Sequence, residues 1–283
     1  MIKILSAGYC SSIQDAGRFG FRHLGVPVSG CMDLTSYNLA NALLNNSPTC
    51  SVIESTYIGP RIQFLASTYV TVTGAQCQLL LNSHCVSINT VLSIKKGDIL
   101  EVGKTRLGCR NYLSILDGFN HEKTLNSQSQ YKGITRYSQL QKNHVISTNQ
   151  SDRLIRNRAS VQLNKQLFNS YLIPALKGPE FSLLNKQTKT KLFSQSFSLS
   201  SQSNRMAFLF NQDLPAGTDE IITSSVQPGT VQLTPSGKVI VLMRDAQTTG
   251  GYARILQLTN LAISQLSQLP VNSKFRFMPI KKP

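Results

Sequence analysis

The densest cluster of residues able to do chemistry lies near the amino terminus. It spans residues 12–20 (SIQDAGRFG) and continues to His23, Ser29 and Asp33. Glycines allow close backbone approach, a histidine exchanges protons near neutral pH, and an arginine binds a carboxylate or phosphate through two parallel hydrogen bonds. These residue types predict a cleft in which Asp15, Arg18 and His23 act. A structured turn held by an Asp15–Arg18 ion pair accounts for the same residues equally well.

A second cluster, residues 245–252 (DAQTTGGY), directly follows the apolar run KVIVLM. Its two threonine hydroxyls and paired glycines are typical of a nest of N–H groups that binds an oxyanion or phosphate. Two further polar residues, Arg205 in SNRM and Gln232 in VQPGTVQ, are candidate anchors for a small planar amide or carboxylate. A loop cap and a Pro-Gly turn are the structural alternative for these two segments.

Nucleotide-loop and metal signatures are absent from the sequence. The segment 97–105 (GDILEVGKT) has one residue too many between its glycines for a phosphate-binding loop, and its middle is strand-like. Neither GxSxG nor GxGxxG occurs. The four histidines form no HxH or HxxxH pair and the six cysteines form no CxxC pair. We therefore expect no metal site built from protein ligands alone, and we expect the thiols to be reduced.

Composition limits the class of protein. The chain has 283 residues, 41% hydrophobic and 15% charged, which is enough apolar material for one large or two modest domains. The formal net charge is +16, but the basic residues are dispersed and no nucleic-acid-binding signature accompanies them. A solvated basic face or a surface for an acidic protein explains the charge better than nucleic acid. No apolar run approaches the ~18 residues of a membrane span, and no secretory signal is recognisable, so we expect no membrane contact and a cytoplasmic location.

Short strands that close on tight turns predict a mainly β chain, as a barrel or sandwich. Expected strands cover residues 2–9 and 69–73, and hairpins are expected in QLLLNSHCVSI, LSIKKGDILEV and VQLTPSGKVIVLM. Helices are expected over 33–45 and 260–269. Residues 120–166 are polar and weakly periodic, which indicates a connector with loops. We place one β region over 1–165, connector included, and a second over 166–283.

Several long segments, in order along nearly the whole chain, together resemble one family. They are SIQDAGRFGFRHLGVPVSGCMD, NLANALLNN, VIESTYIGPRIQF, VTVTGA, RLGCRNYLSILDGF, SNRM, SVQPGTVQLTPSGKVIVLMRDAQTTGGYARI and SKFRF. The sequence is similar to the biotin-dependent carboxyltransferase-like family, also called allophanate hydrolase subunit 2. The resemblance implies a tandem of cyclophilin-like β-barrels with a few short helices and a cleft between or beside them.

The same resemblance implies a function. The expected role is that of the C subunit of an ATP-dependent 5-oxoprolinase, which acts with the B subunit to activate the lactam 5-oxoproline and with the A subunit to complete its cleavage to L-glutamate. ATP with magnesium would then be used by the complex. The alternatives are a regulatory protein that antagonises a kinase inhibitor resembling the B subunit, and the carboxyltransferase component of a urea or allophanate system, which alone would require biotin.

The matching motifs also imply site residues. Catalytic roles are expected for Asp15, Arg18, His23, Arg205 and Gln247, and substrate binding for Ser29, Asp33, Gln232, Thr248, Thr249, Gly250, Gly251 and Tyr252. We expect the amino-terminal and carboxy-terminal motifs to form one anion-binding pocket, with Arg18 or Arg205 holding a carboxylate or phosphate. This chain departs from the family pattern at Gln128, where a basic residue is usual, at Asn204 in place of aspartate, and at Ala246 in place of arginine. These departures bear on catalytic activity.

Overall fold

A computed structural model describes residues 1–149, 153, 155, 161, 168, 171–215 and 220–280. Strands dominate this part of the chain and three α-helices occur in it, so the expectation of a mainly β protein with a few short helices is confirmed. The chain divides into two compact units. The N-terminal unit comprises Met1–Arg18 and Ser29–Phe168, and the C-terminal unit comprises Phe19–Val28 and Asn169–Pro283. The predicted boundary between residues 165 and 166 lies outside the described residues.

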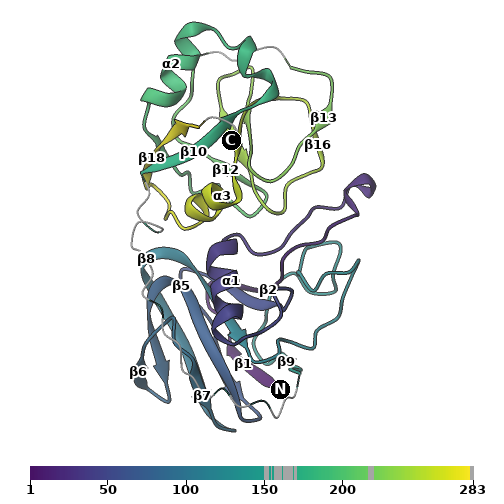
Figure 1. The fold of residues 1–283 in the computed structure, drawn as a ribbon, viewed down its shortest axis with the longest axis vertical. Coiled ribbons are helices and arrows are strands. Elements are labelled where there is room, and N and C mark those ends of the chain that lie inside the picture. The colour runs from purple at the N-terminus through teal and green to yellow at the C-terminus, as the bar shows by residue number, and fades with distance from the viewer. Residues whose placement is uncertain are drawn as a thin grey trace. The chain divides into compact units, whose positions relative to one another are not determined.

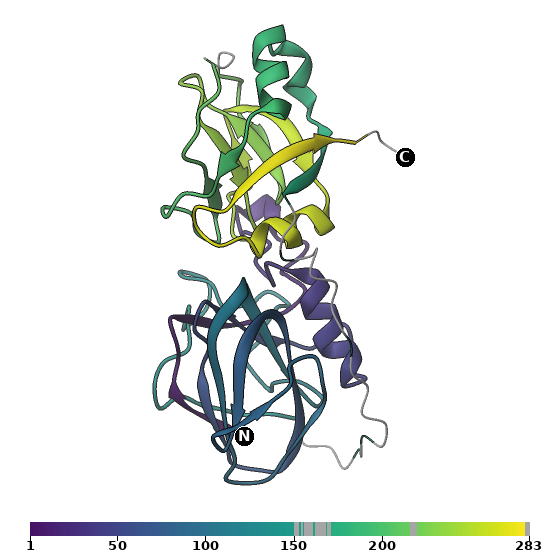
Figure 2. The same cartoon turned by 90° about the vertical axis from the view of Figure 1, so that its left-hand side faces the viewer.

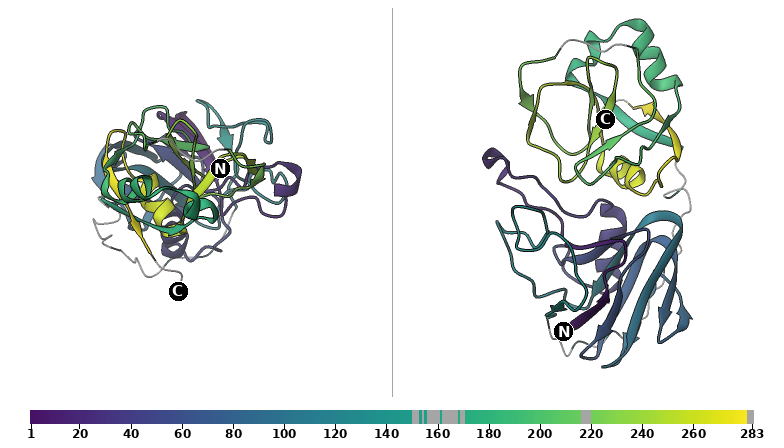
Figure 3. Two further views of the ribbon diagram at one scale, coloured as in Figure 1. Left: turned by 90° about the horizontal axis from the view of Figure 1, so that it is seen from above. Right: turned by 180° about the vertical axis from the view of Figure 1, so that it is seen from behind.

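The N-terminal unit is built on one curled sheet (Figure 1). Its strands are β1 (Ile2–Ser6), β2 (Cys10–Gln14), β3 (Val52–Thr56), β4 (Arg61–Phe64), β5 (Thr68–Leu81), β6 (His84–Val86), β7 (Leu92–Ile94), β8 (Ile99–Ile115) and β9 (Val145–Ile146). The sheet curls because β8 pairs with β4 through its first residues and with β3 through its last. The long strand β5 runs antiparallel beside β8, as the right-hand view of Figure 3 shows.

The alternation of side chains along these strands builds the core of the N-terminal unit. Ile2 and Ile4 of β1, and Val70 and Val72 of β5, are at most 1% exposed. Because successive residues of a strand point to opposite faces, these positions all face the inside of the curled sheet. They pack with buried residues of β2, β3, β4 and β8 in one hydrophobic cluster.

Helix α1 (Leu34–Leu43) confirms the helix predicted over 33–45. The Asp33 carboxylate caps it by accepting hydrogen bonds from the backbone N–H groups of Thr35 and Ser36. Tyr37 and Ala40, three residues apart and therefore on one face, are buried and pack in one cluster with residues of β3 and β8. Figure 2 shows the helix lying along the sheet of this unit. The helix is thus held in place by the Asp33 cap at its N-terminus and by the packing of its buried face.

One of the three predicted hairpins is wrong. The hairpin around Asn82 and Ser83 is confirmed, since β5 pairs with β6 and both turn residues have positive φ. In the segment 92–102, however, β7 pairs with the start of β5, whereas β8 pairs with β4 and β5. The turn between them is held by the Asp98 side chain, which accepts from the Lys95 N–H, and by a Gly97 N–H bond to Phe64. The turn therefore connects β7 and β8, which pair with other strands and not with each other.

The C-terminal unit contains a seven-stranded sheet and a two-stranded ribbon, counted over the described residues. Its strands are β10 (Leu172–Lys177), β11 (Phe197–Ser198), β12 (Ala207–Leu209), β13 (Ser224–Ser225), β14 (Thr230–Leu233), β15 (Val239–Leu242), β16 (Thr249–Gly250), β17 (Ala253–Leu258) and β18 (Lys274–Pro279). The predicted hairpin in 231–243 is confirmed by the pairing of β14 with β15. Strands β13 and β16 form the ribbon.

Aromatic packing and short helices complete the C-terminal unit. Phe197, Phe275 and Phe277 are at most 2% exposed and contact one another, with ring centroids 5.2–6.0 Å apart. Helix α3 (Asn260–Ser267) confirms the helix predicted over 260–269. The 3-10 helix η3 (Pro179–Leu183) and helix α2 (Lys186–Ser194) were not expected from the sequence. Helix α2 lies against β18, as Figure 2 shows.

Part of the predicted connector belongs to the core of the N-terminal unit. Residues 127–130 are at most 9% exposed, although their composition is polar. Their burial is possible because their polar atoms bond to β2 and to neighbouring loops; for example, the Gln130 side chain accepts from the Ile13 N–H. In the described ranges, no helix combines the length and apolar character that a membrane crossing requires.

Candidate functional site

Asp15 organises the segment 127–129 from the end of β2. Its carboxylate accepts hydrogen bonds from the Ser129 hydroxyl at 2.6 Å, the Gln128 N–H at 2.7 Å and the Ser127 hydroxyl at 2.8 Å. It also accepts from the Gly17 N–H at 2.9 Å. With 7% of its surface exposed, Asp15 is buried and bonded on both oxygens. These contacts support the alternative in which Asp15 holds a structured turn. The groups that bond to its carboxylate are hydroxyls and backbone N–H groups.

Arg18 holds the same segment from the other side of the turn. Its Nε donates to the Thr124 carbonyl at 3.0 Å and its Nη2 donates to the Ser129 carbonyl at 2.7 Å. The side chain is fully buried, with 0% exposure. A buried guanidinium that donates to backbone carbonyls fixes a loop. These bonds hold the 124–129 segment in place, and the catalytic role expected of Arg18 stays a prediction.

Ser29 and Asp33 follow on the return of the chain into the N-terminal unit. Ser29 is buried with φ of +57°, and Gly30 lies so close to Gly17 that a Cβ there would come within 2.9 Å of backbone atoms. The Cys31 N–H donates to the Asp15 carbonyl at 3.0 Å, which closes the base of the loop. Asp33 is occupied as the cap of α1, and its own N–H donates to the Tyr112 hydroxyl.

The Gln128 side chain is bonded entirely within the N-terminal unit. Its Oε1 accepts from the Ser51 hydroxyl at 2.7 Å, and its Nε2 donates to the carbonyls of Phe119 and His121. Gln128 is therefore a neutral side chain that is satisfied by local bonds. The expected departure from the family pattern pointed to this segment, but its burial was not foreseen.

Two titratable groups of the N-terminal unit keep their neutral forms near pH 7. Burial, reinforced by the nearby charges of Glu54 and Asp33, raises the pKa of Tyr112 well above its ordinary value. Burial also lowers the pKa of His121. Both side chains therefore add no charge to this unit near neutrality.

His23 lies on the 3-10 helix η1 (Arg22–Leu24), which belongs to the C-terminal unit. Its side chain is exposed, as a group that meets a ligand must be. Its neighbour Arg22 donates from Nη2 to the Val226 carbonyl. The Val226 N–H in turn donates to the Thr248 carbonyl at 3.1 Å. The opening motif thus contributes residues 19–28 to the unit that carries the 247–252 loop.

The 247–252 loop is paired along its backbone. Thr249 and Gly250 pair with Ser225 and Ser224, and the Gly251 carbonyl accepts from the Ile221 N–H. Thr249 is exposed, while Gln247 and Thr248 are half-buried. This ribbon presents hydroxyls and an amide on a fixed backbone.

Gln232 anchors the ribbon from β14. The side chain is 1% exposed, and its Nε2 donates to the Tyr252 carbonyl at 3.4 Å. A Cβ at Gly250 would come within 2.8 Å of the same Nε2, so the glycine permits the close approach. Gln232, Gly250 and Tyr252 are thus brought together, while the substrate-binding role expected of them stays a prediction.

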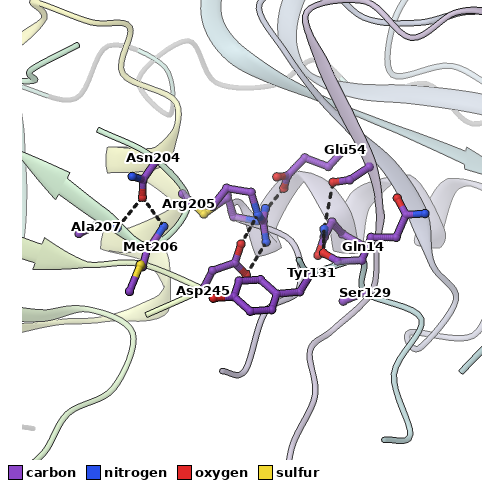
Figure 4. Close-up of polar contacts among 12 residues, drawn as sticks. Gln14, Glu54, Ser129, Tyr131, Asn204, Arg205, Met206, Ala207 and Asp245 are labelled. Carbon is purple, nitrogen blue, oxygen red and sulfur yellow. Dashed lines mark hydrogen bonds and ion pairs between the residues drawn. The ribbon is translucent and has the colours of Figure 1, made fainter. Parts of the chain in front are cut away.

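Arg205 forms a two-bond ion pair with Asp245. Its Nε lies 2.8 Å from Oδ2 and its Nη2 lies 3.2 Å from Oδ1 (Figure 4). The Asp245 N–H also donates to the Arg205 carbonyl at 3.0 Å. Because the carboxylate balances the guanidinium, Arg205 is oriented by Asp245 before any ligand binds. This partner was not predicted, although Asp245 stands first in the second cluster.

The two remaining family departures lie close to this ion pair. The Asn204 side-chain oxygen accepts from the N–H groups of Met206 and Ala207, as an aspartate oxygen at the same position would (Figure 4). Ala246 is 4% exposed and packs with Val226 and Leu242. The Asn204 side chain therefore holds the turn, while Ala246 fills an apolar site.

The predicted site residues fall into two groups. Asp15, Arg18, Ser29 and Asp33 belong to the N-terminal unit, while His23, Arg205, Gln232, Gln247, Thr248, Thr249, Gly250, Gly251 and Tyr252 belong to the C-terminal unit. A pocket shared by Arg18 and Gln247 stays a prediction. The described residues contain no group of three or more His, Cys, Asp or Glu side chains placed to hold a metal ion.

The folded chain is that of a carboxyltransferase domain. It belongs to the family described as "Carboxyltransferase domain, subdomain A and B", whose sequence model matches residues 24–279. The chain is 32% identical over 284 residues to the 5-oxoprolinase C subunit of Escherichia coli, covering 98% of this chain and 91% of that protein. It is 31% identical to the 5-oxoprolinase C subunit of Haemophilus influenzae, covering 98% and 90%.

A solved structure shares the fold over nearly the whole chain. The crystal structure of the K. lactis urea amidolyase matches with a TM-score of 0.87 and 25% identity, covering 99% of this chain. The match covers 19% of that much longer protein. The resemblance inferred from the sequence motifs is confirmed by these comparisons.

Proposed function

We propose that this chain is the C subunit of an ATP-dependent 5-oxoprolinase and is inactive without its partners. In this proposal it acts with the B subunit to activate the lactam of 5-oxoproline, and the A subunit completes the cleavage to L-glutamate in the cytoplasm. The observation that carries the proposal is the likeness, over 98% of the chain, to two proteins named as 5-oxoprolinase C subunits. Such coverage indicates a counterpart of the whole protein.

The chemistry of the C-terminal unit supports this proposal. An unstrained lactam resists hydrolysis because amide resonance is strong, and activation at its oxygen needs donors aimed at the developing negative charge. Gln247 supplies an amide, and Thr248 and Thr249 supply hydroxyls, beside the oriented Arg205–Asp245 pair. His23 is the exposed titratable group of the opening motif and is proposed to relay a proton.

ATP and magnesium are assigned to the assembled complex. The donor set of the 247–252 loop consists of an amide, hydroxyls and backbone groups, which fits a phosphate or an oxyanion. Magnesium prefers carboxylates and phosphate oxygens, and Asp245, the carboxylate that opens this segment, already binds Arg205. The residues fit the anionic group of the nucleotide and do not fit a magnesium site of their own.

Reconstitution with the B and A subunits of 5-oxoprolinase tests the proposal. The chain alone should release no glutamate from 5-oxoproline, and the three proteins with ATP should release it continuously. The Gln247→Ala change should lower the rate by about a hundredfold, the usual cost of one lost transition-state donor. The matched control Gln187→Ala alters an exposed glutamine of α2 and should leave the rate unchanged.

A failure to release glutamate with active B and A subunits would contradict the proposal. An unchanged rate for Gln247→Ala would remove that residue from the mechanism while leaving the assignment of the chain intact. Replacement of Arg205 by alanine should abolish turnover, which is a second test of the proposed catalytic residues.

The second candidate is the carboxyltransferase component of a urea or allophanate system. The structural match to the K. lactis urea amidolyase favours it. This function requires biotin on a carrier protein, and the chain has no Met-Lys-Met carrier motif of its own. Transfer of a carboxyl group from carboxybiotin to urea, with no 5-oxoproline turnover, would favour this candidate.

A further inference from the structure

The C-terminal unit contains a cavity that no predicted site residue lines. Its volume is about 490 Å³, within the ~300–1,000 Å³ typical of small-molecule sites. It is formed where η1 and the turn after β10 meet the segment 225–230 and β17. The lining residues are Arg22, Leu176, Lys177, Gly178, Pro179, Ser225, Val226, Gln227, Thr230, Arg254, Leu256 and Gln257. All belong to one compact unit.

Three of the lining residues are cations, and one of them is neutralised. The Arg254 guanidinium binds the Glu180 carboxylate through Nε at 2.9 Å and Nη2 at 2.7 Å. The Glu180 carboxylate also accepts from the Arg254 N–H, so it is fixed to β17. The Arg254 side chain lowers the pKa of Glu180, which keeps the pair ionised. This pair forms a rigid wall that adds no net charge.

Arg22 and Lys177 supply net positive charge. Arg22 is half-buried and donates one hydrogen bond to a neutral carbonyl, that of Val226. The Lys177 ammonium lies 5.0 Å from the centre of the Phe181 ring, which positions it without neutralising it. Neither cation forms an ion pair within the described part of the chain. The cavity therefore carries two charges that its own residues do not balance.

The rest of the lining suits a small organic molecule. Leu176, Val226 and Leu256 provide apolar surface, while Gln227 and Ser225 provide polar groups. Gln257 is fixed, because its Nε2 donates to the Pro228 carbonyl and its Oε1 accepts from the Thr230 hydroxyl. A guanidinium and an ammonium that line the same cavity suit a carboxylate attached to a compact, partly apolar body.

We propose that this cavity binds a small organic carboxylate, with Arg22 and Lys177 holding the carboxylate group. The Arg254–Glu180 pair and Gln257 shape the cavity, and the apolar residues contact the body of the ligand. The proposal concerns the isolated chain and does not rest on turnover in a complex. It adds Arg22 and Lys177 to the residues that bind ligand.

Binding of matched ligands to the purified full-length chain tests this site. The probes are 5-oxoproline and 2-pyrrolidinone, which have the same lactam ring and differ only in the carboxylate, and inorganic phosphate as the competing class of anion. Titration calorimetry or ligand-observed NMR measures each dissociation constant. We expect 5-oxoproline to bind at least about tenfold more tightly than 2-pyrrolidinone, the gain expected of a charged hydrogen bond, and more tightly than phosphate.

Variants locate the binding. Arg22→Gln and Lys177→Gln should each weaken 5-oxoproline binding by about tenfold, while the control Lys191→Gln, on the exposed side of α2, should change it less than about twofold. Lys177 is exposed, so its variant keeps the fold even if Arg22→Gln does not. Equal binding of 2-pyrrolidinone, preference for phosphate, absence of carboxylate binding, or wild-type affinity in Lys177→Gln would each overturn the proposal.

Discussion

Replacement of Asp15 by alanine is expected to destabilise the N-terminal unit by about 3–5 kcal/mol. The change leaves the N–H groups of Gly17 and Gln128 without their acceptor, and each buried donor left unpaired costs about 1–3 kcal/mol. The hydroxyls of Ser127 and Ser129 lose a charged acceptor but can rotate toward other oxygens. At 7% exposure, the carboxylate is shielded from bulk solvent in the native chain. The loss is a large share of the ~5–15 kcal/mol that holds a typical domain together.

Urea unfolding measures this loss, and hydrogen exchange at the Gln128 amide assigns it to the 127–129 segment. Glu101→Gln is the control, because Glu101 is a carboxylate of the same unit that is 47% exposed and lies 3.6 Å from Arg61. A surface pair of this kind contributes at most about 1 kcal/mol. A loss below about 1 kcal/mol for Asp15→Ala, or unchanged exchange at Gln128, would refute a structural role for the carboxylate.

Three further outcomes are expected. Gly178→Ala should lower the melting temperature, with a loss of about 2–3 kcal/mol, since the new Cβ would lie 2.1 Å from the Arg254 carbonyl oxygen; an unchanged melting curve would contradict the close approach. Arg254 lowers the pKa of Glu180, so the stability due to this pair is present above the ordinary pKa of about 4.3 and is lost as pH falls through the lower folded value. Acid unfolding of Glu180→Gln should lack that loss, and identical pH profiles would count against it. A thiol reagent at pH 8 should modify exposed Cys85 quickly and Cys77 slowly, because burial raises the pKa of Cys77 to about 11; equal rates by mass spectrometry would be the contrary result.

Local sequence signals were enough to predict elements that are bounded by a capping residue or by turn residues. Asp33 before an apolar helical face predicted α1, and Asn82-Ser83 between two apolar runs predicted the β5–β6 hairpin. The partners of a strand are set by distant residues. The segment 92–102 therefore looked like a hairpin, although β7 and β8 pair with other strands.

The candidate site was predictable in its residue types and less so in their partners. Gln232 and Tyr252 were named from motifs and do lie together. The burial of Ser127 and Ser129 could not be predicted, because a polar segment is buried only when distant donors and acceptors satisfy it, here Asp15 and Arg18. The Glu180–Arg254 pair joins residues 74 apart and carries no local pattern at all.

The division of the chain into units has a consequence for experiments on fragments. The backbone passes between the two units after Arg18, after Val28 and again after Phe168. A single cleavage at the last passage would give two separate chains, and residues 19–28 of the C-terminal unit would stay with the N-terminal chain. A fragment that begins at residue 169 would lack η1 and with it Arg22, so the C-terminal half expressed by itself is an incomplete version of its own unit.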